Sequence, residues 1–245
     1  FIGSYLVARL SGEGAHVLSI ALTRARLANL ALVARDQPFA TCDITHGERL
    51  TELFREFQPQ VVYHLAAHPD GQESDVQMRE SLRVNSLGTL NVLDAARAAE
   101  SEVLVLADSC KVYGNGPVPY RSSHPVDPTG SYAIAKAAAW QFCRLTSLLS
   151  GLKVVGLRLT FVYGKRQNWN LVRYVEQCVE RGQPIRLQGG SQTRDPVYVD
   201  DAVDAFVAAA TRSEGFGESI PIGGGREISV ADFCREILNA MGAQA

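Results

Sequence analysis

The chain has 245 residues, of which 46% are hydrophobic and 20% charged, and its formal net charge is −2. This size is enough for one large α/β domain, or one domain plus a small lobe, with a full buried core. The near-neutral charge and the lack of a basic run argue against a nucleic-acid partner, and no apolar run is long enough to cross a membrane, so small-molecule partners are expected.

The first two thirds of the chain alternate predicted strands with predicted helices. The run 61–67 is continuously apolar and short, which is typical of a central parallel strand. Residues 23–37 predict a loop and a helix. Strands are expected at 17–21, 39–44, 61–67, 103–107 and 154–159, and helices at 3–10, 46–57, 78–100 and 132–149. This alternation predicts an α/β fold with a doubly wound parallel sheet.

After residue 164 the composition becomes more polar and aromatic. Segments 165–191 and 223–245 are interpreted as a small C-terminal lobe interleaved with the sheet domain, which comprises 1–164 and the returning segment 192–222. The expected elements are helices at 171–181, 200–211 and 230–241, and strands at 185–188 and 219–222.

The cysteines and histidines indicate neither disulfides nor a metal site. The five cysteines are scattered and lack paired spacing, which favours a reducing, cytoplasmic compartment: Cys42, Cys110, Cys143, Cys178 and Cys234. His64 lies in a strand-like run, so a packed histidine is expected there rather than a metal ligand shared with His68. Cys110 is expected to be a small buried residue because no histidine is placed to activate it.

Three residues predict proton-transfer chemistry. Tyr132 and Lys136 are four positions apart and therefore share one face of the predicted helix. Tyrosine is a poor base because its pKa is about 10, but a neighbouring ammonium favours the phenolate. Ser109 follows the strand at 103–107 and is placed to hydrogen-bond a substrate oxygen. This order of residues predicts an enzyme.

Other candidate ligand contacts follow predicted strand ends, where parallel sheets bind ligands. Asp43, Ala66 with Ala67, and Thr160 with Phe161 occupy such positions, and Asp43 is placed to accept from an adenine amino group. Gly3 at a helix start would let a pyrophosphate approach backbone N–H groups. Arg194 is expected to clamp a diphosphate, with Asp200 capping the helix that follows.

Taken together, these motifs resemble the extended short-chain dehydrogenase/reductase family, in its nucleotide-sugar epimerase/dehydratase branch. The matching pieces span almost the whole chain in the family's order: Phe1-Ile2-Gly3, Asp43-Ile44, His64 to Ala67, Asn85 to Thr89, Lys111 to Gly114, Tyr132 with Lys136, Val162 to Gly164, Gln192 to Asp195 and Val199 to Asp201. The resemblance implies a Rossmann-type sheet that binds NAD, a nucleotide-sugar substrate and a homodimer paired through the helices that start at Met78 and Tyr132.

The resemblance also implies site residues. Phe1, Ile2 and Gly3 would end a G-x-x-G-x-x-G fingerprint, of which the first strand and the first two glycines are missing. The other implied cofactor contacts are Asp43, Ile44, Leu65, Ala66, Ala67, Asn85, Thr160, Tyr132 and Lys136. The implied catalytic set is Ser109, Tyr132 and Lys136. The implied substrate contacts are Ser109, Lys111, Phe161 and Arg194.

Departures from the family pattern refine these expectations. The second strand ends in Ala21-Leu22 where NAD-preferring relatives have an acid, and Arg24 and Arg26 lie nearby, so NADP is also possible. Phe161 stands where relatives usually have an asparagine. Most of the family's C-terminal substrate lobe does not appear before Ala245.

Cys110-Lys111 replaces the Asp-Glu or Asp-Lys pair that dehydratases of this branch often carry. An epimerase is therefore favoured, in which Tyr132 removes a proton from a sugar hydroxyl, commonly at C4, as hydride passes to the nicotinamide and then returns to the opposite face. A 4,6-dehydratase or 4-ketoreductase is the alternative, and a non-catalytic cofactor-binding protein is the second alternative.

Overall fold

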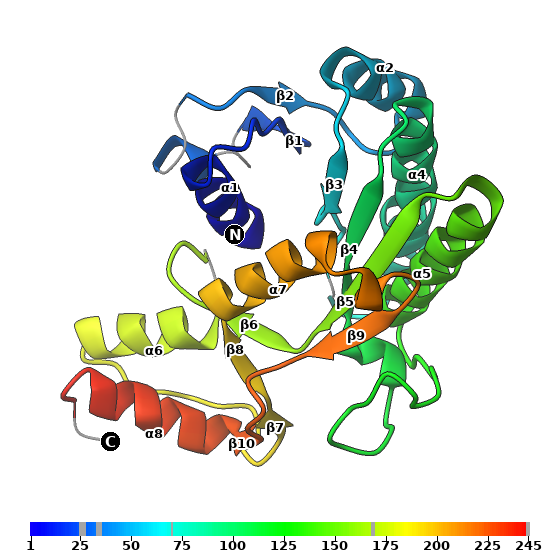
Figure 1. Cartoon of the computed structure of the whole chain (residues 1–245). Helices are drawn as coiled ribbons and strands as arrows, with labels where there is room; N and C mark the ends of the chain where they lie inside the picture. Colours follow the sequence, from blue (N-terminus) through cyan, green and yellow to red (C-terminus); the bar gives the residue numbers. More distant parts are fainter. Residues whose placement is uncertain (25–27, 33–35, 70, 168–169, 244–245) are drawn as a thin grey trace.

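The centre of the molecule is a sheet of four parallel strands in the order β3-β4-β5-β9. A computed structural model describes residues 1–24, 28–32, 36–69, 71–167 and 170–243. The strands of this sheet are β3 (Val61–His64), β4 (Val103–Ser109), β5 (Lys153–Leu159) and β9 (Ser219–Ile222). Parallel pairing places their carboxyl ends at the same edge of the sheet, as the sequence predicts, and Figure 1 shows the smaller pairs of strands around it.

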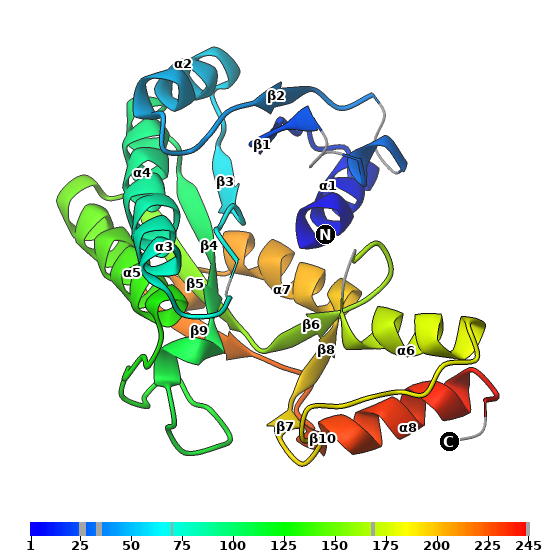
Figure 2. The same ribbon diagram turned by 180° about the vertical axis from the view of Figure 1, so that it is seen from behind.

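Three two-stranded pairs surround this sheet. β1 (Ser19–Ala21) runs parallel to β2 (Phe39–Thr41), and β6 (Phe161–Tyr163) runs parallel to β8 (Pro196–Tyr198). β7 (Thr193–Arg194) is antiparallel to β10 (Ile228–Ser229). In the part of the chain that the structure describes, β1 does not pair with β3, and Figure 2 shows the first helix beside β1.

Helices cover both faces of the central sheet because its strands alternate their apolar side chains between the two faces. On one face, Leu104 and Val154 pack with Leu93 and Trp140, and on the other, Val105 packs in the cluster that contains Phe206. The first face carries α2 (Gly47–Phe57), α3 (Asp75–Glu80), η3 (Ser81–Leu87), α4 (Gly88–Ala98) and α5 (Ser131–Ser150), and the second carries α1 (Ile2–Gly12) and α7 (Val199–Thr211).

A separate apolar cluster lies away from the sheet. Here α6 (Leu171–Glu180) packs on α8 (Val230–Ala240), with Val175 and Phe233 buried between them. Asn170 and Ser229 cap the two helices, since their side-chain oxygens accept from backbone N–H groups at the third residue along. One-turn helices η2 (Leu30–Leu32), η4 (Cys110–Tyr113) and η5 (Ser213–Gly215) complete the described chain.

Several predicted elements differ from the structure. The predicted strand 185–188 is wrong: the Arg186 N–H donates to the Tyr174 hydroxyl at 2.9 Å and that hydroxyl donates to the Arg186 carbonyl at 3.1 Å, so one side chain satisfies the backbone groups that a partner strand would take. The two-residue and three-residue strands β6, β7, β8 and β10 were not predicted, because elements this short carry no periodicity.

The bounds of several predicted elements also differ from those in the structure. The predicted helix 78–100 begins earlier, at Asp75, and its middle, η3, is a π-helix. Two predicted strands end before their apolar runs do, β2 at Thr41 and β3 at His64. Asp200 does not cap α7, because the helix already begins at Val199; the carboxylate lies in the first turn, where it still faces the positive end of the helix dipole. Among the described residues, no helix is both long enough and apolar enough to span a bilayer.

Candidate active site

The strand β4 delivers Ser109 to the carboxyl edge of the sheet. Ser109 is the last residue of β4 and is 9% exposed. Its hydroxyl oxygen accepts from the Lys111 N–H at 3.2 Å, which caps the one-turn helix η4. The cap fixes the direction in which the chain leaves the strand, and with it the place of the hydroxyl.

The helix α5 brings Tyr132 and Lys136 to the same strand. Tyr132 lies in the first turn, and Lys136 lies one turn later with only 3% of its surface exposed. The Lys136 ammonium donates to the Ala107 carbonyl of β4 at 2.8 Å, and its Nζ atom is 5.9 Å from the centre of the Tyr132 ring. The structure thus assembles the three residues of the predicted catalytic set at one strand end.

A loop residue that the sequence analysis missed holds the start of α5. The Glu73 carboxylate accepts from the Ser131 N–H at 2.9 Å, one residue before Tyr132. A negative charge at this helix terminus also interacts favourably with the helix dipole. Nothing in the sequence pattern marks Glu73, since the contact joins residues 58 positions apart.

A cavity of about 660 Å³ collects five of the predicted cofactor residues along its wall. These residues are Phe1, Gly3, Ile44, Leu65 and Ala66. No heavy atom lies within 4 Å of a Cβ built on Gly3, so the mouth of α1 is open, as the approach of a pyrophosphate to a helix start requires.

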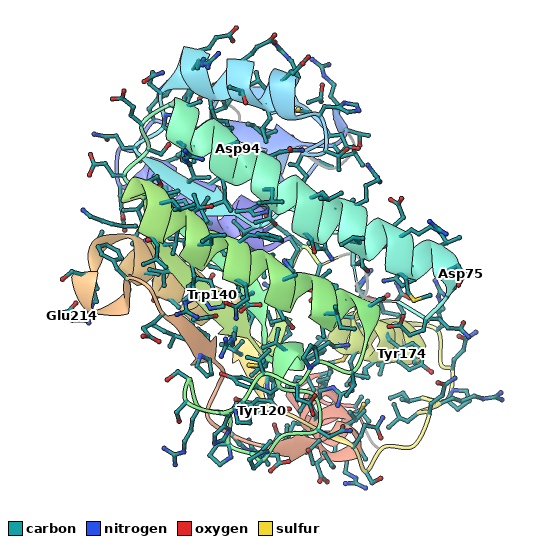
Figure 3. All side chains as sticks on the ribbon, turned by 90° about the vertical axis from the view of Figure 1, so that its right-hand side faces the viewer. Asp75, Asp94, Tyr120, Trp140, Tyr174 and Glu214 are labelled. Carbon is teal, nitrogen blue, oxygen red and sulfur yellow. The ribbon has the colours of Figure 1, made fainter. Side chains whose placement is uncertain are left out.

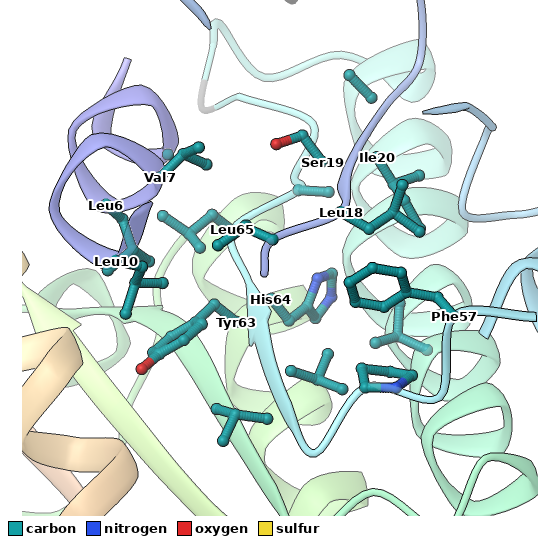
Figure 4. Close-up of a pocket in the computed structure, with 18 of the residues that line it drawn as sticks. Leu6, Val7, Leu10, Leu18, Ser19, Ile20, Phe57, Tyr63, His64 and Leu65 are labelled. Carbon is teal, nitrogen blue, oxygen red and sulfur yellow. The ribbon is translucent and has the colours of Figure 1, made fainter. Parts of the chain in front are cut away.

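The same cavity continues between the facing edges of β1 and β3. Figure 4 shows Ser19 and Ile20 on one side and Tyr63, His64 and Leu65 on the other. These two strand edges face each other across the cavity and belong to different sheets of the described structure.

The remaining predicted cofactor residues lie outside the cavity wall. Ile2 packs into the apolar cluster behind the sheet, and Ala67 is exposed. Arg24 stacks over the Phe39 ring at 5.3 Å, and Arg26 lies outside the described residues. The Thr160 hydroxyl donates to the Ile222 carbonyl at 3.1 Å.

Asp43 is already engaged by protein groups. Burial opposes ionisation of its carboxylate, but hydrogen bonds from the N–H and hydroxyl of Thr45, together with the Arg83 guanidinium, lower its pKa below the ordinary value. Its Oδ1 accepts from the Thr45 N–H at 2.9 Å and its Oδ2 lies 3.5 Å from Arg83.

Asn85 clamps the loop that follows β3. It is 1% exposed; its Oδ1 accepts from the His68 N–H at 2.7 Å and its Nδ2 donates to the His68 carbonyl at 3.1 Å. His68 also contacts Gln77 at 3.0 Å. This accounts for His68 as a structural residue, and it shows how the π-helix η3 shapes the loop that carries Leu65 to Ala67.

Replacing Asn85 with alanine should lower the free energy of unfolding by about 2–4 kcal/mol, because both backbone groups of His68 lose their buried partner. Chemical denaturation with intact protein as reference measures the loss. We also expect weaker NAD retention, measured by the cofactor content of the purified variant. A variant as stable as the parent would show that water replaces the amide and that the clamp is unimportant.

The predicted substrate residues other than Ser109 lie on three different elements of the described structure. Phe161 packs its ring edge-on against Phe233, with centroids 6.2 Å apart, in the α6–α8 cluster. Arg194 is exposed on β7 and donates to the neighbouring Thr193 carbonyl at 2.7 Å. Lys111 is exposed in η4, directly after the strand that ends in Ser109.

Comparison with known proteins decides the family. The sequence model of the NAD dependent epimerase/dehydratase family matches residues 1–223. The chain belongs to this family. It is 34% identical to a UDP-glucose 4-epimerase of Mycolicibacterium smegmatis, over 99% of this chain and 80% of that protein.

Solved structures of the family share the fold. A UDP-glucose 4-epimerase of Thermus thermophilus in complex with NAD is 30% identical, with a TM-score of 0.87, and covers 100% of this chain and 81% of its own. A Thermotoga maritima UDP-glucose 4-epimerase with UDP-glucose is 28% identical, with a TM-score of 0.89 and coverages of 100% and 81%. The predicted Rossmann-type α/β fold and the predicted family are therefore confirmed.

NAD is the cofactor of this epimerase/dehydratase family, and the described residues fit it. The open mouth of α1 at Gly3 suits a pyrophosphate, and the exposed Ala66 and Ala67 leave the backbone accessible beside it. Apolar side chains from Phe1, Ile44 and Leu65 line the cavity and suit the apolar faces of a dinucleotide's rings.

Proposed function

We propose that this family member is an NAD-dependent nucleotide-sugar epimerase that acts on a sugar hydroxyl through a transient keto-sugar. The observation that carries the proposal is the meeting of Ser109, Tyr132 and Lys136 at the carboxyl end of β4. UDP-glucose is the first substrate to test, since the relatives named above are UDP-glucose 4-epimerases.

In the proposed reaction the sugar loses a proton from its hydroxyl group and a hydride from the carbon that carries this hydroxyl. Tyr132, as the phenolate, accepts the proton of the sugar hydroxyl, and Ser109 hydrogen-bonds the oxygen that becomes a carbonyl. NAD held at Gly3 and beside Ala66 and Ala67 would supply the acceptor for the hydride from the same carbon and the donor for its return. Return of the hydride to the opposite face, with return of the proton from Tyr132, inverts the carbon without net oxidation.

The setting of Lys136 suits its role beside Tyr132. Burial lowers the pKa of Lys136, while the nearby Asp108 carboxylate acts to raise it. An ammonium held in a low-dielectric site stabilises a neighbouring phenolate more strongly than one in water does. Lys136 therefore makes Tyr132 a usable base near neutral pH.

The residue after Ser109 supports epimerisation over dehydration. Cys110 is 5% exposed, and burial raises the pKa of its thiol to about 12. Its Sγ donates to the Arg158 carbonyl at 2.9 Å. A buried thiol that already donates a hydrogen bond to a carbonyl is a poor proton donor for a leaving hydroxyl. The position at which dehydratases carry an acid therefore supplies none here.

A stereochemistry-resolving NMR assay tests the proposal. Purified protein with NAD is incubated separately with UDP-, dTDP-, CDP- and GDP-sugars, and the sugar proton signals are followed. We expect interconversion of UDP-glucose and its C4 epimer with no net NADH formation. Unchanged sugars in every sample would overturn the proposal, and a 4-keto-6-deoxy product would select the dehydratase.

The proposed assembly is a homodimer through the outer face of α3 to α5. Figure 3 shows these helices side by side on one face of the molecule. Trp140 and Cys143 of α5 pack inward on the sheet, whereas several large apolar side chains on these helices are more than half exposed, notably Val76 (71%), Leu82 (56%), Ile134 (54%) and Leu148 (82%). Pairing two copies would bury this apolar surface in a four-helix contact.

Light scattering should give the mass of a dimer for the parent and that of a monomer for Leu82→Asp, because an aspartate in a dry helix contact loses its hydration. Val118→Asp is the matched control: Val118 is 58% exposed in a loop and its replacement should leave the dimer intact. A monomeric parent would remove the assembly proposal.

The proposed compartment is the cytoplasm. All five cysteines are free and buried, at positions 42, 110, 143, 178 and 234. Free thiols in this number favour a reducing environment.

A further inference from the structure

A buried ion pair lies directly behind Ser109. Asp108 and Arg158 are 3% and 5% exposed, and the Arg158 Nε atom is 3.3 Å from the Asp108 Oδ2 atom across the β4–β5 pair. Arg158 is not among the site residues predicted from the sequence. The signal for Arg158 was present, since it is a charged residue inside the apolar run 154–159.

Asp108 is the hub of this buried network. Its Oδ1 accepts from the Ser109 N–H at 2.8 Å, and its Oδ2 accepts from the Ser219 hydroxyl at 2.8 Å. The Ser219 side chain lies against Gly156 of β5. A Cβ at position 156 would come within 2.5 Å of the Ser219 hydroxyl oxygen, so the absence of a side chain there leaves room for this hydroxyl. The pair partner Arg158 extends the network to the Tyr113 hydroxyl at 2.6 Å.

The same carboxylate acts on the charge of Lys136, whose Nζ atom donates to the carbonyl of Ala107, the residue before Asp108. Besides Tyr132, the titratable groups facing Lys136 are His64 from β3, Asp108 from β4 and Cys143 from α5. Burial lowers the pKa of His64 to about 3 and raises that of Cys143 to about 12, so both are neutral near pH 7. Among these groups of the described chain, Asp108 alone carries negative charge near neutral pH.

Charge balance then requires Asp108 to be ionised. Burial raises the pKa of Asp108, and against it act the hydroxyl of Ser219, the N–H of Ser109 and the charges of Lys136 and Arg158. A neutral Asp108 would leave two buried cations without a counter-charge, which costs far more than the burial of one paired carboxylate.

We propose that Asp108 is a positioning residue for the catalytic set: its buried carboxylate fixes the backbone at Ser109 and supplies the counter-charge that keeps Lys136 an ammonium beside Tyr132. The catalytic part of this inference rests on the proposed epimerase function, whereas the charge coupling to Lys136 does not.

The coupling has a measurable sign. Removing the carboxylate leaves Lys136 buried without its counter-charge, so Lys136 gives up its proton at lower pH. Catalysis needs Lys136 protonated and Tyr132 ionised, which places the loss of Lys136 charge on the alkaline side of the rate profile. Asp108→Asn should therefore move that alkaline limb to lower pH.

The direct test titrates Lys136 by NMR in protein labelled at the lysine 13Cε carbon. The chain has four lysines, at positions 111, 136, 153 and 165, so the spectrum is simple, and Lys136→Met assigns the signal. In Asp108→Asn the Lys136 midpoint should fall by at least about one pH unit relative to the parent. An unchanged or higher midpoint would overturn the proposal.

Two further variants separate charge from packing. Ser219→Ala removes a hydrogen bond to the same Oδ2 atom but keeps the charge, so the Lys136 midpoint should move by less than about 0.3 pH units. A shift as large as that of Asp108→Asn would show that packing, not charge, sets it. Arg158→Met leaves Asp108 to Lys136 alone and must raise the midpoint, which keeps the test decisive if Asp108→Asn does not fold.

Kinetics then test the catalytic part. In Asp108→Asn we expect kcat to fall about 10- to 100-fold at pH 8 with KM changed less than about threefold, as for lost positioning of a reacting group. A parent that leaves every sugar unchanged, with a shifted Lys136 midpoint in the variant, would refute the epimerase function and keep the charge coupling. A shifted midpoint with parent-like kcat would refute the catalytic part alone.

Discussion

Replacing Tyr132 with phenylalanine should lower the epimerisation rate by about 10²- to 10⁴-fold while NAD stays bound, because the variant loses the phenolate that takes the sugar proton and keeps the ring. Tyr132 is half-buried in the first turn of α5, and Lys136 holds this helix to β4 through the Ala107 carbonyl, independently of the Tyr132 hydroxyl. The fold should therefore survive the change. Rates come from the NMR assay and the cofactor content from the absorbance of released NAD.

The outcomes of this substitution separate the catalytic hypotheses from the non-catalytic one. A rate within a few-fold of the parent would remove Tyr132 as the base. A large loss of activity with NAD retained supports proton transfer at Tyr132. A parent without activity on any sugar would instead support the non-catalytic cofactor-binding reading. Loss of NAD together with activity would show that the hydroxyl serves the cofactor more than the proton.

Lowering the pH from 7 to 4 should cost about 3 kcal/mol of folding free energy through His64 alone, at about 1.4 kcal/mol per pH unit. Burial lowers the pKa of His64 from 6.5 to about 3 in the folded protein. Between these two pKa values the unfolded chain therefore binds a proton at His64 and the folded chain does not. The stabilisation is fully present above pH 6.5 and is lost as the pH falls toward 3.

The hydrogen bonds of His64 explain why it stays neutral. The Thr89 hydroxyl donates to the Asn85 carbonyl at 2.7 Å, so its oxygen accepts from the His64 Nε2–H at 2.9 Å. This contact fixes the tautomer with the proton on Nε2. A second proton on the ring would be buried at 4% exposure beside the Lys136 charge.

Urea denaturation at a series of pH values measures this effect. In His64→Gln the slope of stability against pH between 6 and 4 should flatten by about one proton's contribution. His46→Gln is the matched control, since His46 is exposed at the start of α2 and makes no side-chain cap; it should keep the parent slope. A parent slope unaffected by His64→Gln would contradict the buried, neutral state.

Long periodic segments were predictable, and short paired ones were not. The apolar run that became β4 and the helix that carries Lys136 were placed within two residues at each end. Strands such as β7 and β10 exist only because they pair with each other, 34 residues apart, so no local pattern marks them. The predicted strand 185–188 failed for the converse reason, since a tyrosine hydroxyl took its hydrogen bonds.

The amino-acid sequence by itself determined the parallel α/β class, the family and the candidate set Ser109, Tyr132 and Lys136, because periodicity, strand-end position and the four-residue spacing on a helix are local properties. Only the tertiary structure decided that Asp108 faces Arg158, Ser219 and the Lys136 charge, that Asn85 holds the loop after β3, and that Glu73 meets the start of α5. These contacts join different strands and loops, and the charge state of a buried group depends on neighbours that only folding brings together.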